Sequence, residues 1–128
     1  MKPFSVDLER SNNRLHIRLQ AIPMGRDWCL ILTGGDAPHL GATAVAQACP
    51  NPAKGGVSAS VSVITLPGHK EDLLARELAD RVATAANANV SVCCGIHLED
   101  ITQEEIEDVL TQCREMVEEV LRKIEAEL

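Results

Sequence analysis

Residues 28–41, Trp-Cys-Leu-Ile-Leu-Thr-Gly-Gly-Asp-Ala-Pro-His-Leu-Gly, decide how this chain folds. The apolar run over residues 28–33 predicts a strand that is buried on both faces and lies centrally in a sheet. The run ends at Gly34 and Gly35, and adjacent glycines adopt positive φ angles and expose backbone N–H groups that suit an anion or a carbonyl. His39 adds a titratable ring beside this turn. The stretch predicts either a small site at the end of a buried strand or a plain hairpin turn between two strands.

The segments around this stretch alternate between polar and apolar residues, as strands do. Residues 14–20 place Leu15, Ile17 and Leu19 on one face, and residues 57–66 alternate valine and alanine with serine. His16 falls on the wet face of its strand and is expected to be an ordinary surface histidine. The expected strands are 5–10, 14–20, 28–33, 42–48, 57–66 and 90–97, and the expected loops include 23–27 and 49–56.

Apolar residues at helical spacing predict two helices, one ending near residue 87 and one running from residue 102 to the end of the sequence. Thr102 and Glu105 have the spacing of a capping box at the start of the second helix. The first apolar stripe consists of Leu74, Leu78, Val82 and Ala85, and the second of Ile106, Val109, Leu110, Cys113, Val117, Val120, Leu121, Ile124 and Leu128. The sequence therefore predicts an α+β fold in the order β-β-β-β-β-α-β-α, as a single domain over residues 1–128.

Composition excludes some classes of partner. Aromatic residues make up 2% of the 128 residues, so bases have almost nothing to stack on, and the net charge of −7 repels phosphate backbones. Nucleic acid is therefore not an expected partner. No apolar run approaches the ~18 residues of a membrane span, and residues 1–7 lack the apolar core of a signal peptide.

Five cysteines, with no Cys-x-x-Cys pair, indicate reduced thiols in a cytoplasmic protein. Cys93 and Cys94 are neighbours on an expected strand, so their side chains should point to opposite faces. We interpret the cysteines as small buried apolar residues.

The second expected helix carries most of the charge. Residues 102–128 hold nine acidic and three basic residues, which accounts for six of the seven net negative charges. Its outer face is either merely solvated or steers the protein toward a basic partner.

Three histidines lie just past the ends of expected elements: His39, His69 and His97. They could bind zinc if they converged, but no two have a short ligand spacing, and we expect no metal. The segment 68–70, Gly-His-Lys, either binds an anion at a helix start or only precedes a capped helix. Gly95, inside an expected strand, indicates a bulge or a close approach by another backbone or a ligand. The chain has no nucleophile elbow, phosphate loop or dinucleotide fingerprint, so a binding module is a better interpretation than an enzyme.

Three blocks of sequence carry a resemblance to a known family. They are residues 30–41 (Leu-Ile-Leu-Thr-Gly-Gly-x-x-Pro-His-Leu-Gly), residues 67–72 (Pro-Gly-His-Lys-Glu-Asp) and residues 95–102 (Gly-Ile-His-x-x-x-Ile-Thr). In this order they resemble the LpdD-like family, the small D subunits of hydroxyarylic acid (gallate-type) decarboxylases that are described as prenylated-flavin chaperones. The resemblance implies a mainly antiparallel sheet of about six strands with two helices, similar to the small proteasome-assembly chaperones and usually paired as a homodimer.

The resemblance also implies a function. A member of this family would be a non-catalytic accessory protein that helps prenylated FMN reach a UbiD-type aromatic acid decarboxylase. The positions carried over as cofactor-binding are Thr33, Gly34, Gly35, His39, Gly41, Gly68, His69, Lys70, Gly95 and His97. With few aromatic residues to stack on the flavin, binding should be transient. The alternative is an assembly chaperone or structural subunit that acts by protein–protein contact without a cofactor.

Overall fold

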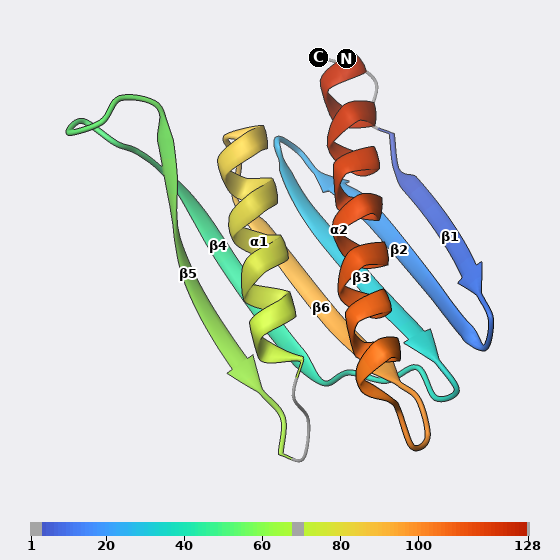
Figure 1. Cartoon of the computed structure of the whole chain (residues 1–128). Helices are drawn as coiled ribbons and strands as arrows, with labels where there is room; N and C mark the ends of the chain where they lie inside the picture. The colour runs from blue at the N-terminus through green and yellow to red at the C-terminus, as the bar shows by residue number, and fades with distance from the viewer. Residues whose placement is uncertain (1–3, 68–70, 128) are drawn as a thin grey trace.

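A computed structural model describes residues 4–67 and 71–127 and shows two layers (Figure 1). One layer is a six-stranded sheet, and both helices lie on the same face of it. The elements are β1 (Val6–Asn12), β2 (Leu15–Met24), β3 (Asp27–Gly35), β4 (Ala42–Pro50), β5 (Val57–Thr65), α1 (Asp72–Ala86), β6 (Val90–His97) and α2 (Gln103–Ala126). The predicted class and element order are confirmed.

The strands lie in the order β1-β2-β3-β6-β4-β5. Every neighbouring pair is antiparallel except β3 and β6, which are parallel. The predicted central position of the apolar stretch is thus confirmed, since β3 and β6 are the two middle strands. Because β3 and β6 are parallel, their C-terminal residues, Gly35 and His97, lie side by side at the same end of the sheet.

The connection between β3 and β4 is not a hairpin, because β6 lies between the two strands. Residues 36–41 instead cross the end of β6, where the Gly41 N–H donates to the Cys94 carbonyl at 2.9 Å. The carbonyl of His39 lies directly against Gly95, and a methyl group on Gly95 would overlap it. The hairpin interpretation is wrong, and the predicted close approach at Gly95 is confirmed as an approach by backbone.

Two expected loops are shorter than predicted. β2 continues through Pro23 to Met24, which pairs with Asp27, so only two residues remain for the turn. Gly25 in this turn has a φ of 64°, which glycine adopts without strain and which keeps the loop short. β4 likewise continues to Pro50, opposite Val57.

The core lies between the helices and the inner face of the sheet. α1 packs on β4, β5 and β6 with a row of alanines, Ala75, Ala79 and Ala83, against the small residues of β4. Small residues on both sides allow the helix and the sheet to approach closely. The apolar stripes predicted for the two helices are wrong at Ala85 and Ile106, because both residues are exposed. The face of α1 that contacts the sheet includes its alanines instead, and the buried face of α2 includes Met116.

The opposite face of the sheet is not covered by either helix (Figure 1). Its central strands present half-buried side chains there, including Cys29, Ile31 and Cys93, while Val45 is 53% exposed. Cys94 points into the core, so the predicted opposite orientation of Cys93 and Cys94 is confirmed.

Gly95→Ala tests the crossing. The added methyl meets the His39 carbonyl, which belongs to the backbone and cannot rotate away, so we expect a loss of about 2–3 kcal/mol in the free energy of unfolding. Urea unfolding followed by circular dichroism measures it. Ser91→Ala, on the same face of the same strand, is the control and should stay close to wild type. A Gly95→Ala protein as stable as wild type would show that residues 36–41 do not press on β6.

Candidate functional site

The candidate site is built where β3 and β6 end. The Asp36 N–H donates to the carbonyl of His97 at 2.7 Å, which fixes the first residue after β3 to the last residue of β6. From here the two chains diverge, because residues 36–41 cross toward β4 and residues 98–102 lead to α2. The N-terminal ends of both helices lie at this same end of the molecule (Figure 1).

His39 is held by hydrogen bonds from both ring nitrogens. Nδ1 lies 3.0 Å from the carbonyl oxygen of Ala37, and Nε2 lies 2.9 Å from Oε1 of Glu71. Both side chains of the His39–Glu71 pair are largely buried, at 21% and 13% exposed. A carbonyl and a carboxylate are both acceptors, so each ring nitrogen of His39 faces an acceptor that fixes the orientation of the ring.

His97 lies beside this pair but is held less firmly. Its ring centroid is 6.4 Å from that of His39, with the rings inclined by 74°. Its Nε2 is 3.4 Å from the carboxylate of Glu99, and its side chain is 51% exposed. His39 is therefore held between chain segments, whereas half of the His97 side chain is open to solvent.

The structure brings together most of the predicted site residues. Gly34, Gly35, His39, Gly41, Gly95 and His97 lie at this end, and Thr33 is paired with Gly95 in the sheet register. The predicted Gly68, His69 and Lys70 lie outside the described residues. Sequence reasoning missed Glu71 as a partner of His39, although its acidic side chain just before a helix was the available signal.

The glycines provide space for close packing. Gly35, with a φ of 77°, leaves room for the backbone of His97, and Gly41 leaves room for the carboxylate of Glu71. The N–H of Asp36, which would belong to an anion-binding nest at the glycine pair, donates to His97 instead. These glycines allow the histidines and Glu71 to converge.

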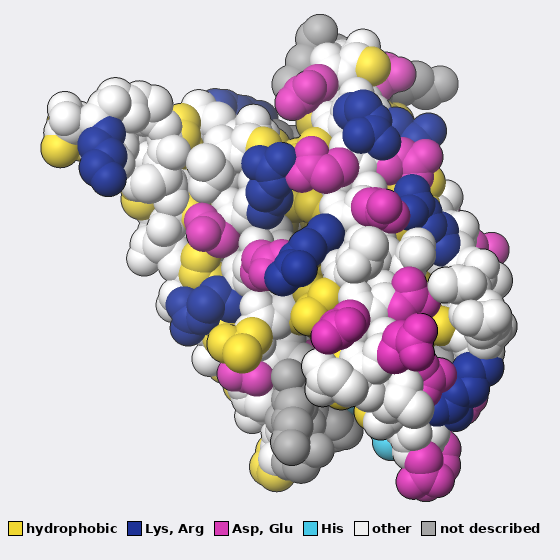
Figure 2. All heavy atoms as spheres, in the orientation of Figure 1, with side chains coloured by type: hydrophobic (Ala, Val, Ile, Leu, Met, Phe, Trp, Pro, Cys, Tyr) yellow, Lys and Arg dark blue, Asp and Glu magenta, His cyan; other side chains and the backbone are white. Residues whose placement is uncertain are grey.

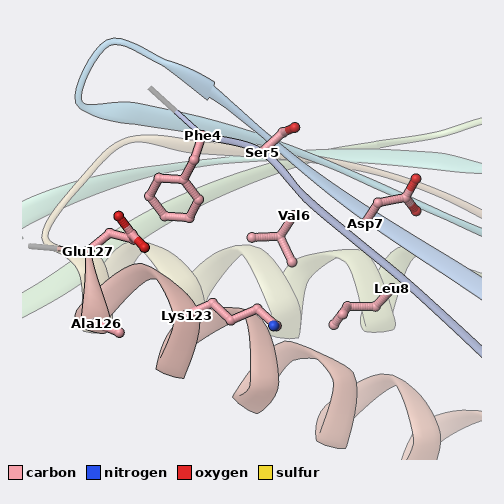
Figure 3. Close-up of a pocket in the computed structure, with 8 residues that line it drawn as sticks. All are labelled: Phe4, Ser5, Val6, Asp7, Leu8, Lys123, Ala126 and Glu127. Atoms are coloured by element: carbon pink, nitrogen blue, oxygen red, sulfur yellow. The ribbon is translucent and has the colours of Figure 1, made fainter. Parts of the chain in front are cut away.

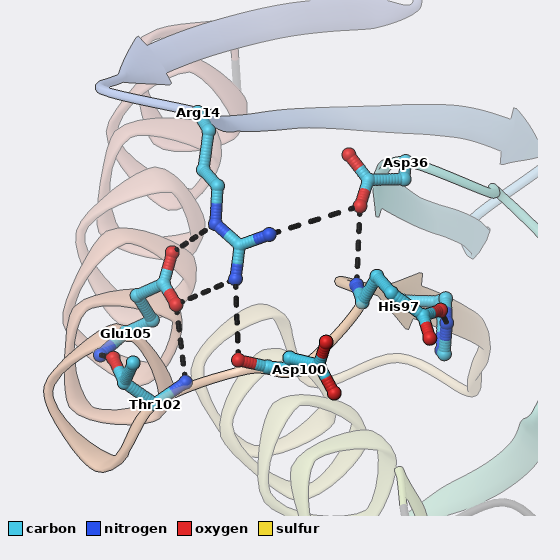
Figure 4. Close-up of polar contacts among 7 residues, drawn as sticks. Arg14, Asp36, His97, Asp100, Thr102 and Glu105 are labelled. Atoms are coloured by element: carbon cyan, nitrogen blue, oxygen red, sulfur yellow. Dashed lines mark hydrogen bonds and ion pairs between the residues drawn. The ribbon is translucent and has the colours of Figure 1, made fainter.

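Arg14, in the turn between β1 and β2, ties the same end together from the side (Figure 4). Its guanidinium makes two hydrogen bonds to Glu105, at 2.6 and 2.7 Å, and lies 4.0 Å from the carboxylate of Asp36. Asp36 in turn accepts the N–H of Glu99 at 3.1 Å. Arg14 therefore links the start of α2 to both segments that leave the sheet beside His97.

Glu105 has two roles, since it also accepts the N–H of Thr102 while the Thr102 hydroxyl accepts the N–H of Glu105. The predicted capping box is confirmed. The Arg14 guanidinium and the Thr102 backbone N–H lower the pKa of Glu105 from 4.5 to about 2.

The two buried thiols, Cys94 and Cys113, do not contribute a reactive group. Burial raises the pKa of the Cys113 thiol to about 12 and raises that of Cys94 as well, so both remain protonated. For these two the interpretation as small buried apolar residues is confirmed.

The two large aromatic residues and one cavity lie at the other end of the sheet. Phe4 and Trp28 pack edge to face with ring centroids 5.5 Å apart, and Trp28 is at the start of β3. Phe4 lines a cavity of about 310 Å³ between the start of β1 and the end of α2 (Figure 3). Since these are the only phenylalanine and tryptophan in the chain, neither stacks on a ligand held by His39 and His97.

The protein is a two-layer α+β fold with a small histidine–carboxylate cluster at one end. Its architecture is similar to a solved structure described as a novel chaperone complex for yeast 20S proteasome assembly, with a TM-score of 0.54 and 16% identity over 91% of this chain and 98% of that chain. At this identity the likeness concerns the fold alone.

The family is shown by sequence. A family model for the prenylated flavin chaperone LpdD-like domain matches residues 11–125, so the chain belongs to this family, as its motifs predicted. No curated protein matches the chain.

Neither helix in the part of the chain that the structure describes is long and apolar enough to cross a membrane. No group of three metal-ligating side chains is found among residues 4–67 and 71–127, and the predicted alternative of a three-histidine zinc site depends on His69, which is not among them.

Glu105→Gln tests the Arg14–Glu105 pair at the start of α2, because the contribution of this pair to stability should depend on pH. A carboxylate whose pKa falls to about 2 on folding stabilises the fold above its unfolded value, near 4.5, and this contribution is lost as the pH drops toward 2. The difference in unfolding free energy between wild type and Glu105→Gln should be larger at pH 5 than at pH 3, as measured by urea unfolding. Glu77→Gln, which removes the comparable Arg114–Glu77 pair between the helices, is the control for helix pairing away from the site. Hydrogen exchange should quicken at the Glu99 amide only in Glu105→Gln, and equal exchange in both variants would contradict the link.

Proposed function

We propose that this protein is a non-catalytic accessory subunit that binds prenylated FMN transiently and hands it to a UbiD-type aromatic acid decarboxylase. Membership of the prenylated flavin chaperone family supports the ligand class. The observation that carries the site is the convergence of His39, His97 and Glu71 at one end of the sheet, from three segments far apart in sequence.

The donors present fit a flavin nucleotide. Flavin carbonyl and phosphate oxygens accept hydrogen bonds, and His97 is exposed enough to donate to them. His39 is the less mobile of the two, because Ala37 and Glu71 already orient its ring. We assign the flavin-binding role to the predicted set, from Thr33 to His97, with Glu71 added as the residue that positions His39.

Among the described residues at this end, no aromatic side chain is placed to stack on a flavin, and this supports transient rather than tight binding of prenylated FMN. Flavin rings are large apolar surfaces, and a stacked aromatic ring would add binding free energy that has to be recovered on release. A site built on hydrogen bonds and one mobile histidine binds more weakly. The cofactor then remains transferable.

The alternative function, assembly through protein contact alone, is favoured by one observation. The uncovered face of the sheet presents apolar side chains at its centre, around Ile31 and Val45. We propose that this face pairs two copies of the chain as a homodimer, which is compatible with either function because it leaves the histidine end free.

His39→Ala and His97→Ala separate the two functions. If the protein binds prenylated FMN, His97→Ala should weaken cofactor binding about tenfold, as expected for a lost hydrogen bond to the ligand. His39→Ala should also weaken it, because it removes the contact with Glu71 that orders the site beside His97. Both losses should appear as reduced retention of the cofactor on gel filtration. His16→Ala is the matched control, since His16 is also a half-exposed histidine with a carboxylate neighbour, Glu9, on the sheet surface.

Circular dichroism and thermal unfolding establish that each variant is folded. Cofactor retention by the wild type, reduced in both site variants and kept in His16→Ala, supports the proposal. Absence of retention by the folded wild type contradicts it and leaves the assembly function.

Val45→Asp tests the homodimer. A carboxylate at this half-exposed position would be buried without a partner between two sheets, so the variant should be a monomer by light scattering where the wild type is a dimer. Thr111→Asp, at an exposed position of α2 on the helix side of the sheet, is the control for added charge. A wild-type monomer, or an unchanged dimer in Val45→Asp, would exclude this face as the interface.

A further inference from the structure

Exposed aliphatic side chains gather at the end of the molecule that holds the histidines. Among the described residues, nine large apolar side chains are exposed, and five of them belong to connections or first helical turns at this end: Leu40, Leu66, Leu73, Ile101 and Ile106. We name these five the apolar rim. Ile22 and Met24 lie instead at the far end of β2, and Val45 and Ile64 lie on the open sheet face.

The rim is tied to the candidate site by backbone contacts. The Leu66 N–H donates to the carbonyl of Gly41 at 2.9 Å, so Leu66 lies beside the segment that carries Leu40 and His39. Leu73, 74% exposed, follows Glu71 by two residues in the first turn of α1. Figure 2 shows hydrophobic atoms at the surface over the start of α1. Exposed apolar residues that gather in one place, unlike single scattered ones, often mark a surface that contacts a partner.

The charged residues around the rim are mainly acidic. Asp36, Glu99, Asp100 and Glu104 are exposed at this end, and Glu99 has 77% of its side chain in solvent. Of the described basic residues near the rim, Arg14 is already engaged with Glu105 and Asp36, and Arg76 lies exposed one turn after Leu73 on α1. An acidic border around apolar residues complements a partner surface that is apolar at its centre and basic at its edge.

We propose that the apolar rim and its acidic border dock on the decarboxylase catalytic subunit, at a surface bordered by lysine and arginine beside the opening of its flavin site. This proposal rests on the proposed function and adds the place of contact. A site that receives a flavin phosphate must supply cationic groups. The acidic border attracts those cations and at the same time disfavours retention of the phosphate, so it promotes both encounter and release. Because the histidines lie within the rim, the cofactor would have only a short distance to move.

Leu73→Ser tests the docking, with Met24→Ser as the matched control. Both positions are highly exposed, at 74% and 60%, and they lie at opposite ends of the molecule. The probe is a purified UbiD-type gallate decarboxylase catalytic subunit without cofactor, and binding is measured by biolayer interferometry. We expect Leu73→Ser to weaken affinity about tenfold and Met24→Ser to change it less than about twofold. The double variant Glu99→Gln, Asp100→Asn should slow association and reduce its dependence on salt.

The outcomes separate the docking surface from the function. Equal affinity of Leu73→Ser and wild type, or equal losses in Leu73→Ser and Met24→Ser, overturns the docking proposal. If Leu73→Ser still retains prenylated FMN on gel filtration, the proposed cofactor role stands independently of that result. Wild-type protein that retains the cofactor but does not bind the catalytic subunit overturns the docking surface and the handover together, whereas wild-type protein that retains no cofactor overturns the cofactor role itself.

Discussion

The crossing of residues 36–41 over the end of β6 is the constraint on which the rest of the site depends. The chain can pass there only because Gly95 has no side chain, so the His39 carbonyl rests against the strand. With its backbone fixed in this way, the His39 ring is directed to Glu71, just before α1. The same crossing separates β3 from β4 and makes room for β6 between them, which places His97 beside Gly35. The sheet order and the histidine cluster are thus two results of one close backbone contact.

The sequence predicted elements well where the hydrophobic pattern was long and regular. Residues 28–33 were assigned to the centre of the sheet because a strand with apolar residues on both faces must be covered on both sides. The order of elements followed from the spacing of apolar residues, which repeat every two residues in strands and every three to four in helices. Pairing was less predictable. Nothing local to Gly34 and Gly35 distinguishes a hairpin from a crossing, because the strand that separates β3 from β4 comes more than 50 residues later in the chain. Strand ends were misplaced at Pro23 and Pro50 for a similar reason, since partner strands there extend the ladder past residues that usually end one.

For the candidate site, the sequence identified residue types but not their partners. His39 and His97 were singled out by their places next to strand ends, and they do converge. Glu71 was not linked to His39, because the reach of its side chain to His39 depends on the three-dimensional crossing. The acidic second helix was interpreted as one charged face, yet arginines from other elements pair with several of its carboxylates: Arg10 with Glu115, Arg14 with Glu105 and Arg81 with Glu118. Sequence separations of 37 to 105 residues hide such pairs from any local pattern.

The positions of these arginine pairs determine where negative charge remains unpaired on the surface. Each exposed ion pair contributes only about 0–1 kcal/mol to stability. The main effect of these pairs is therefore on the surface charge, because they neutralise some carboxylates and leave others without a basic partner. Along the side of α2, the pairs with Arg10 and Arg81 offset its acids, whereas at the histidine end Arg14 is taken up by Glu105 and Asp36 while Glu99 and Asp100 remain in solvent. Negative potential is therefore concentrated beside His97, on a segment that Asp36 holds through the Glu99 N–H. Under the proposed function this arrangement suits a carrier of an anionic cofactor, because a field that opposes tight retention of a phosphate also attracts a basic receptor. The charges and the lack of an aromatic platform near His39 would then both favour release of that cofactor.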